Sequence, residues 1–159
     1  FSESPWGERL CAVCADFIEW TCDQTQQFDL IISNPPFFAN GALAPIEERR
    51  IARHEGTLCV DSIIASAEVL LKPHGRLALI LPAEQKQRIE FQTSLHAMQL
   101  NKSCLVRTVE RKAPRRILFE ISAGCDNPVH TKEMLTIQNS DGNPSDYYRQ
   151  LVEPFYIHI

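Results

Sequence analysis

The hydrophobic pattern of the chain predicts strands that alternate with helices. Residues 28–33 contain an uninterrupted apolar run from Leu30 to Ile32, and residues 77–81 form a second continuous run. A strand without polar alternation suits a parallel sheet whose two faces are both covered by helices. Between the two runs, residues 57–72 place apolar side chains at helical spacing, and a turn with Pro73 and Gly75 is expected to end that helix.

Upstream of the first apolar run, residues 10–15 are expected to form a short buried strand, followed by a polar connector over residues 19–27. Cys11 and Cys14 in this strand have the spacing of half a zinc site. Positions three apart on a strand point to opposite faces, and no second Cys-x-x-Cys or pair of histidines completes the set. We therefore interpret both cysteines as small core residues and predict no metal site.

Weaker patterns follow in the second half of the chain. Residues 84–99 predict an amphipathic helix with four apolar side chains on its inner face. These are Ile89, Phe91, Leu95 and Met98. Two β-rich runs, residues 103–109 and 117–122, predict an antiparallel hairpin. Residues 133–138 predict a further strand, which ends in a turn over residues 139–144.

The first apolar strand runs directly into Asn34, Pro35, Pro36 and Phe37. The prolines end the strand because they cannot donate to a strand ladder, and a residue before proline favours extended geometry. In open α/β sheets, ligands bind at the carboxyl ends of the strands. Residues 34–37, which we call the tip, therefore present an amide side chain, free backbone carbonyls and an aromatic ring where a ligand is expected.

These groups suit a reaction at an exocyclic amino nitrogen such as that of adenine. The side-chain oxygen of Asn34 and the carbonyl of Pro35 can accept its two N–H bonds and localise the nitrogen lone pair. That interaction strengthens as positive charge develops, so it favours the transition state. Phe37 would stack on the base, a contact worth about 1–3 kcal/mol. The alternative is an ordinary Asn-Pro turn after a strand.

Three segments of the chain resemble a known family, the bacterial valine-tRNA adenine-N6 methyltransferases. They are residues 1–10, residues 34–41 and the pair Phe155 and Tyr156. The resemblance implies a Rossmann-like α/β class I methyltransferase fold, with a mostly parallel sheet in the order 3-2-1-4-5-7-6 and a C-terminal antiparallel hairpin. It also implies methylation of the adenine just 3′ of the anticodon, with Asn34 to Phe37 as the catalytic motif.

The same resemblance implies S-adenosyl-L-methionine as cofactor. Asp16 and Phe17 match the positions that hold the cofactor's adenine, and Asn34 would border the cofactor as well. An Asp that starts a turn is the alternative for Asp16. The family's first strand and glycine-rich turn have no counterpart in the sequence. We therefore expect residues 1–159 to be the C-terminal portion of one methyltransferase domain, completed by a longer chain or by a partner chain, and to self-associate when isolated.

Two basic clusters contrast with the net charge of −4. One comprises Arg111, Lys112, Arg115 and Arg116, and the other, which follows the Asn-Pro-Pro-Phe tip, comprises Arg49, Arg50 and Arg53. Charged loops are often merely solvated, but a basic patch beside a base-binding tip favours RNA contact. We predict that both clusters bind the anticodon loop of a tRNA.

Composition limits the function classes. The chain is 44% hydrophobic and 23% charged, as in ordinary globular domains, and no apolar run is long enough to cross a membrane. Six irregularly spaced cysteines fit a reduced, cytoplasmic protein better than a disulfide scaffold. Three alternatives remain: methylation of a protein glutamine at N5, methylation of guanine N2 in ribosomal RNA, and a binding module without catalysis.

Overall fold

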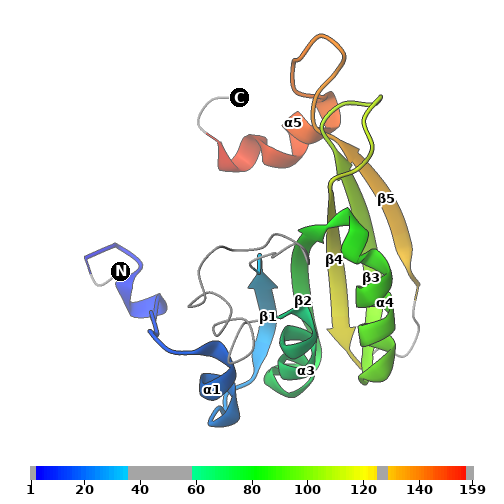
Figure 1. The fold of residues 1–159 in the computed structure, drawn as a ribbon. Coiled ribbons are helices and arrows are strands. Elements are labelled where there is room, and N and C mark those ends of the chain that lie inside the picture. Colours follow the sequence, from blue (N-terminus) through cyan, green and yellow to red (C-terminus); the bar gives the residue numbers. More distant parts are fainter. Residues whose placement is uncertain (1–2, 36–58, 125–128, 157–159) are drawn as a thin grey trace, which may run out of the picture.

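The computed structural model describes residues 3–35, 59–124 and 129–156. Five strands form one mixed sheet in the order β1-β2-β4-β3-β5 (Figure 1). Their bounds are β1 Phe28–Ser33, β2 Leu71–Pro82, β3 Met98–Arg107, β4 Arg116–Ala123 and β5 Thr131–Thr136. β1 is parallel to β2, β3 is parallel to β5, and β4 is antiparallel to both of its neighbours. The order β1-β2-β4-β3 matches the 4-5-7-6 part of the expected sheet, so the α/β prediction is confirmed.

Helices connect these strands. They are α1 Phe17–Cys22, α3 Val60–Leu70, α4 Lys86–Leu95 and α5 Asp146–Val152, with short 3-10 turns at Gly7–Arg9, Ala83–Gln85 and Glu153–Phe155. Figure 1 shows α3 and α4 side by side on one face of the sheet. None of the helices in the described ranges is long and apolar enough to span a membrane.

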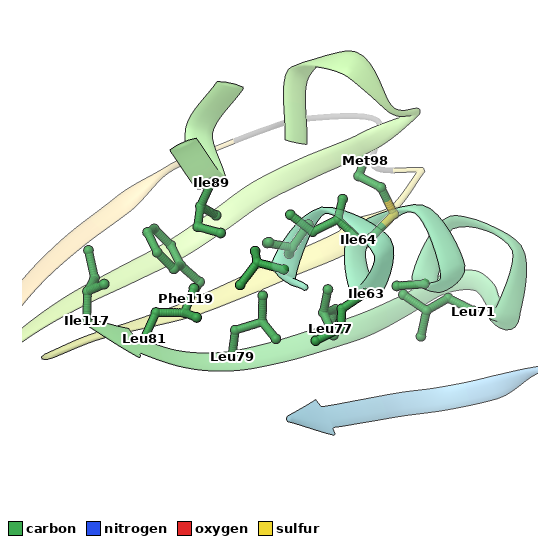
Figure 2. Close-up of a cluster of buried hydrophobic side chains, with 13 residues drawn as sticks. Ile63, Ile64, Leu71, Leu77, Leu79, Leu81, Ile89, Met98, Ile117 and Phe119 are labelled. Carbon is green, nitrogen blue, oxygen red and sulfur yellow. The ribbon is translucent and has the colours of Figure 1, made fainter. Parts of the chain in front are cut away.

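The hydrophobic core lies between this helical layer and the sheet (Figure 2). Alternate residues of a strand point to the same face, so every second residue of β2 and of β4 meets the helices. The side chains that do so include Leu77, Leu79, Leu81, Ile117, Phe119 and Ile121 from the strands and Ile63, Ile64 and Ile89 from the helices. The residues between them, such as Ile80 and Leu118, line a hollow on the other face.

The expectation that residues 28–33 are covered on both faces is wrong. β1 pairs only with β2 among the described strands, and α3 and α4 cover one face of the sheet. Ile32 points to the other face and is 74% exposed. The apolar run therefore forms a strand, as predicted, but the strand lies at the edge of this sheet.

The predicted turn after the first helix is instead a bulge within β2. Phe28 pairs with Leu71 and Leu30 pairs with Arg76, so two steps along β1 correspond to five steps along β2. His74 adopts a positive φ of 64° inside this bulge. A Cβ atom on Gly75 would lie 2.9 Å from the carbonyl oxygen of Phe28, so only glycine fits without a shift.

The segment before β1 also differs from expectation. Residues 10–15 pair with no described strand and are exposed, including Cys11 and Cys14, which are therefore not core residues. An apolar segment becomes a strand only when a neighbour supplies hydrogen bonds, and the described residues supply none here. The expected polar connector over residues 19–27 contains most of α1 instead.

α4 is shorter than the helix expected over residues 84–99. Ile89 is buried, and Thr93, four residues later, is on the same face. Phe91 and Leu95 are 59% and 60% exposed, so they do not belong to the inner face. Met98 is buried, but as the first residue of β3.

The C-terminal predictions agree better with the structure. β3 and β4 form the predicted antiparallel hairpin, with Val106 opposite Arg116 at its closed end. β5 begins two residues before the expected strand. The turn after it is closed by a bridge between Gln138 and Pro144, and Gly142 adopts a φ of 88° there. Local β-rich runs therefore predicted this part of the sheet correctly.

Candidate active site at the carboxyl edge of the sheet

β1, β2, β3 and β5 all run in one direction, so they end at the same edge of the sheet, which we call the carboxyl edge (Figure 1). β4 runs the other way and begins there, at Arg116. The loop that joins β3 to β4 therefore starts and finishes at the carboxyl edge. The topology brings Asn34, which follows β1, to the same edge as this basic loop.

Asn34 follows the last paired residue of β1, Ser33, which lies opposite Leu79. Its side chain is exposed, and Asn34 borders a hollow of about 440 Å³ on the open face of the sheet, lined also by Ile80 and Leu118. Within residues 3–35, 59–124 and 129–156, the structure gives the Asn34 amide no hydrogen-bond partner. No described residue therefore occupies its oxygen.

Pro35 is buried directly after this exposed amide. Burial of the ring anchors the chain at the point where the tip leaves the sheet. Pro36 and Phe37 lie outside the described residues, so the stacking role of Phe37 stays a prediction.

The β3–β4 loop carries the first basic cluster. Arg111, Lys112, Arg115 and Arg116 are all exposed. The backbone N–H of Ala83 donates to the carbonyl of Arg115 at 3.2 Å, which ties the loop to the end of β2. This hydrogen bond holds the loop next to the end of β2, the strand that pairs with β1. Residues Arg49, Arg50 and Arg53 lie outside the described residues.

Asp16 and Phe17 are not brought to Asn34. Oδ1 of Asp16 accepts the backbone N–H groups of Ile18 and Glu19 at 2.9 and 3.1 Å, so Asp16 is the N-cap of α1. Phe17 lines a hollow with Trp20 and Phe28, at the amino end of β1. Six residue steps separate Phe28 from Asn34, about 20 Å along an extended strand. The cofactor role of Asp16 and Phe17 therefore stays a prediction.

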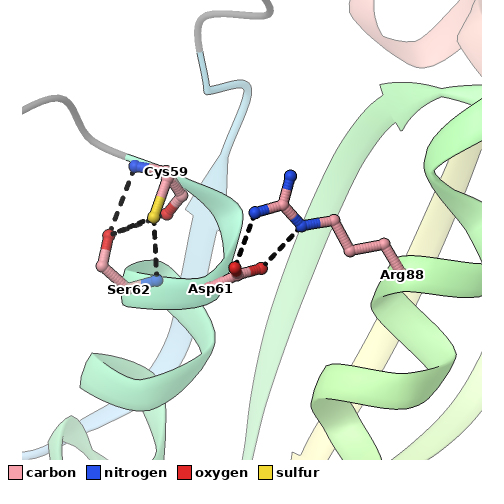
Figure 3. Close-up of polar contacts among 4 residues, drawn as sticks. All are labelled: Cys59, Asp61, Ser62 and Arg88. Atoms are coloured by element: carbon pink, nitrogen blue, oxygen red, sulfur yellow. Dashed lines mark hydrogen bonds and ion pairs between the residues drawn. The ribbon is translucent and has the colours of Figure 1, made fainter. Parts of the chain in front are cut away.

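An ion pair that the sequence did not reveal joins α3 to α4 (Figure 3). Arg88 Nε donates to Asp61 Oδ1 at 3.0 Å, and Nη2 donates to Oδ2 at 2.6 Å. This contact raises the pKa of the Arg88 guanidinium above its ordinary value. Because Asp61 lies in the first turn of α3, the pair fixes the point at which the chain re-enters the described fold after the tip. The two residues are 27 positions apart, so no local pattern could predict the contact.

The start of α3 is also capped. Cys59 Sγ accepts the N–H of Ser62 at 3.4 Å, and Ser62 Oγ accepts the N–H of Cys59 at 3.2 Å (Figure 3). This reciprocal arrangement is a capping box, with sulfur in place of the usual hydroxyl. Together with Asp61 it holds the first turn of α3 in one position.

Comparison with known proteins places the chain in a family, although no protein-family model matches it. A tRNA1(Val) (adenine(37)-N6)-methyltransferase from Porphyromonas gingivalis is 36% identical over 159 residues, which cover 96% of this chain and 62% of that protein. One from Shewanella halifaxensis is 33% identical over 171 residues, covering 100% of this chain and 69% of that protein. The chain thus spans less than two thirds of the length of the first relative and slightly more than two thirds of the length of the second.

A solved structure shares the fold. The crystal structure of a protein from Agrobacterium tumefaciens, described as a predicted O-methyltransferase, aligns with a TM-score of 0.57 at 15% identity. The alignment covers 79% of this chain and 51% of that protein. This likeness concerns the fold alone. By the extent and identity of the sequence match, the chain belongs to the tRNA1(Val) (adenine(37)-N6)-methyltransferase family.

Proposed function

We propose that this chain carries the catalytic edge of an S-adenosyl-L-methionine-dependent methyltransferase that modifies the N6 amino group of adenine in the anticodon loop of a tRNA. One observation carries the proposal: Asn34, whose amide has no partner among the described residues, and an exposed basic loop lie at the same edge of one sheet. The amide oxygen can accept a hydrogen bond from an amino group, and the basic side chains of the loop can bind the phosphates of a nucleic acid. Membership of the family supports the same chemistry.

Asn34 and Pro35 act on the amino nitrogen of the target base. The Asn34 side-chain oxygen and the Pro35 carbonyl accept its two N–H bonds and draw the nitrogen toward tetrahedral geometry. These acceptors are set in place before the reaction, because Pro35 is buried and Pro36 restricts the backbone before it. They stabilise the positive charge that develops on the nitrogen, and the effect is largest in the transition state.

S-adenosyl-L-methionine supplies the methyl group in this chemistry. The described residues do not form its site on their own, because Asp16 and Phe17 are at the other end of β1 from Asn34. The proposal therefore includes a longer protein, in which residues 1–159 are the C-terminal portion of a single domain. The relatives have this extra length. Added strands next to β1 would give residues 10–15 the hydrogen-bond partners that they lack here.

Basic side chains bind the phosphates of the RNA, and the RNA presents an unstacked base to the tip. Arg111, Lys112 and Arg115 contact phosphates, and Arg49, Arg50 and Arg53 contribute from the segment after the tip. Loop nucleotides of RNA can be splayed out at low cost, which gives the tip access to the N6 amino group. A tRNA substrate and cysteines that are free in the described ranges fit a cytoplasmic protein.

Methyl transfer by the full-length protein tests the proposal. The protein is incubated with labelled cofactor and tRNA transcripts, and the RNA is digested to nucleosides. We expect N6-methyladenosine from a single loop adenosine, and none when that adenosine is replaced by guanosine. Label in guanosine or in protein glutamine would identify one of the other amino-group methylations, and no label in any substrate would indicate a binding module.

A further inference from the structure

A polar cavity of about 630 Å³ opens at the carboxyl edge, between the β3–β4 loop and the turn after β5. Arg107, the last residue of β3, and Arg111 of the loop line one side, and Gln138, Asn139 and Ser140 line it from the turn. Small-molecule sites occupy about 300–1,000 Å³. The cavity therefore has room for one nucleotide.

Hydrogen bonds between the loop and the turn fix the shape of this cavity. Arg107 Nε donates to Thr136 Oγ1 at 2.9 Å, and its Nη1 donates to the Glu110 carbonyl at 2.9 Å. The backbone N–H of Gln138 donates to the carbonyl of Thr108 at 2.8 Å, so pairing continues beyond the ends of β3 and β5. A site whose walls are already ordered loses less conformational entropy on binding.

Three polar side chains that line the cavity are engaged by no described residue. In the part of the chain that the structure describes, Arg111, Gln138 and Ser140 have no side-chain hydrogen bond or ion pair. A guanidinium offers a planar set of donors that matches phosphate, whereas an amide and a hydroxyl both donate and accept. This combination suits the phosphate and the ribose or base edge of a ribonucleotide.

The charge of the cavity also favours an anion. Glu110 is the acidic residue among its described lining residues, and its side chain is 90% exposed. Its Oε1 lies 3.7 Å from Nη2 of Arg107, so the two charges largely offset one another. The charge of Arg111 remains, and Lys112 and Arg115 add to it from the same loop.

The position of the cavity sets which part of the RNA can reach it. β2 and β4 lie between β1 and β3, so the cavity is about 15 Å from Asn34 across the sheet. A base held at Asn34 cannot also fill it. We propose that the cavity binds a second unpaired ribonucleotide of the same RNA, with its phosphate on Arg111 and its ribose or base edge on Gln138 and Ser140. This inference rests on the proposed function of the Asn34 tip.

The test uses the full-length protein and an RNA hairpin that contains the target adenosine in its loop. Binding is followed by fluorescence anisotropy over a range of salt concentrations. Arg111→Ala should weaken binding about tenfold, the effect of losing one charged hydrogen bond, and should make the salt dependence shallower by about 0.7. Lys132→Ala is the matched control, because Lys132 is exposed at the amino end of β5. It should bind like the wild type.

A second series identifies the nucleotide. Hairpins are made in which one loop position at a time, other than the target, lacks its base. Gln138→Ala should weaken binding of the intact hairpin several-fold, and this difference should vanish for the RNA that lacks the base read by Gln138. If Arg111→Ala and Gln138→Ala both bind every hairpin as Lys132→Ala does, the cavity is not an RNA site. Failure of the wild type to methylate adenosine would instead overturn the proposed function, because the binding measurements do not depend on methyl transfer.

Discussion

Arg88 donates two hydrogen bonds to Asp61, at 3.0 and 2.6 Å, and so links the first turn of α3 to α4. Both side chains are partly exposed, at 47% and 32%, so solvent weakens the pair. The pair fixes the first turn of α3 against α4.

A double-mutant cycle with Arg88→Ala and Asp61→Ala should measure a coupling of about 0.5–1 kcal/mol in the free energy of unfolding. Urea denaturation of the full-length protein gives the four values. Lys86 and Glu90 form a longer contact of 4.0 Å one turn apart on α4, and this pair is the control with a smaller expected coupling. Equal couplings for the two pairs would show that the bidentate geometry adds nothing.

Asn34→Ala should lower the rate of methyl transfer by about 10²–10³, because one of two preorganised acceptors is lost. Asn34→Asp keeps an oxygen at the same place and should retain more activity than the alanine variant. Single-turnover rates at saturating RNA separate this effect from binding. A rate for Asn34→Ala within threefold of the wild type would remove Asn34 from the mechanism.

Phe37→Ala should weaken use of the RNA by about 1–3 kcal/mol through lost stacking, whereas Phe37→Tyr should have little effect. The ratio kcat/KM for the RNA is the quantity to compare. Phe91 is an exposed aromatic residue on α4, far from the tip in sequence, and Phe91→Ala serves as the control. If the alanine and tyrosine variants of Phe37 behave alike, its ring does not stack on the substrate.

The contact of Glu68 with the loop before β3 predicts a pH dependence of stability. Its carboxylate accepts the backbone N–H of Ala97 at 2.9 Å and lies 2.6 Å from Nδ1 of His96. These hydrogen bonds, that of Ala97 first, lower the pKa of Glu68. A lowered folded-state pKa contributes stability that is complete above the unfolded-state value, about 4.3, and is lost as the pH falls through the folded-state value.

Glu68→Gln should therefore be less stable than the wild type at pH 7, and the difference should shrink as the pH falls below about 4. Thermal unfolding from pH 7 to pH 3 gives the comparison. Glu84→Gln is the control, because the structure gives Glu84 no ion pair within the described residues. A constant difference between Glu68→Gln and the wild type over this range would show that the charge of Glu68 does not stabilise the fold.

The isolated 159-residue chain should self-associate and should not bind S-adenosyl-L-methionine appreciably. β1 presents an unpaired edge in the described sheet, and Ile32 is largely exposed on its open face. The residues expected to hold the cofactor lie at opposite ends of β1. Sedimentation and calorimetry on this polypeptide provide the measurements. A monomer with micromolar affinity would place the cofactor site within the chain itself.

The sequence predicted the elements that depend on local patterns along the chain. The runs at residues 28–33 and 77–81 became β1 and β2, and the hairpin of β3 and β4 is where the β-rich runs indicated. Residues 10–15 were misjudged, because apolar character shows that a segment can be buried but does not supply the neighbour that would bury it. The same limit applies to Ile32. Its side chain is of a type that is usually buried, but it is exposed on the open face of the sheet.

The parts of the site that could not be predicted depend on distant residues. Asp61 and Arg88 meet because α3 and α4 pack side by side, and nothing near either residue signals the other. Nothing near Arg107 in the sequence indicates that Thr136, at the end of β5, and Gln138, in the turn that follows, lie beside it. By contrast, Asn34 could be proposed from the sequence, because its prolines and the preceding strand are adjacent to it, and its role stays a prediction.

The reversed direction of β4 has a consequence for how such proteins diversify. Because β4 begins where β3 ends, their connecting loop can lengthen, shorten or change its charges without altering the register of either strand. Asn34 follows a different strand, β1, which is three places away from β3 across the sheet. Under the proposed function, substitutions in the loop would change the nucleic acid that it binds and leave the amide and its prolines untouched, so selection could alter the choice of substrate and the chemistry independently.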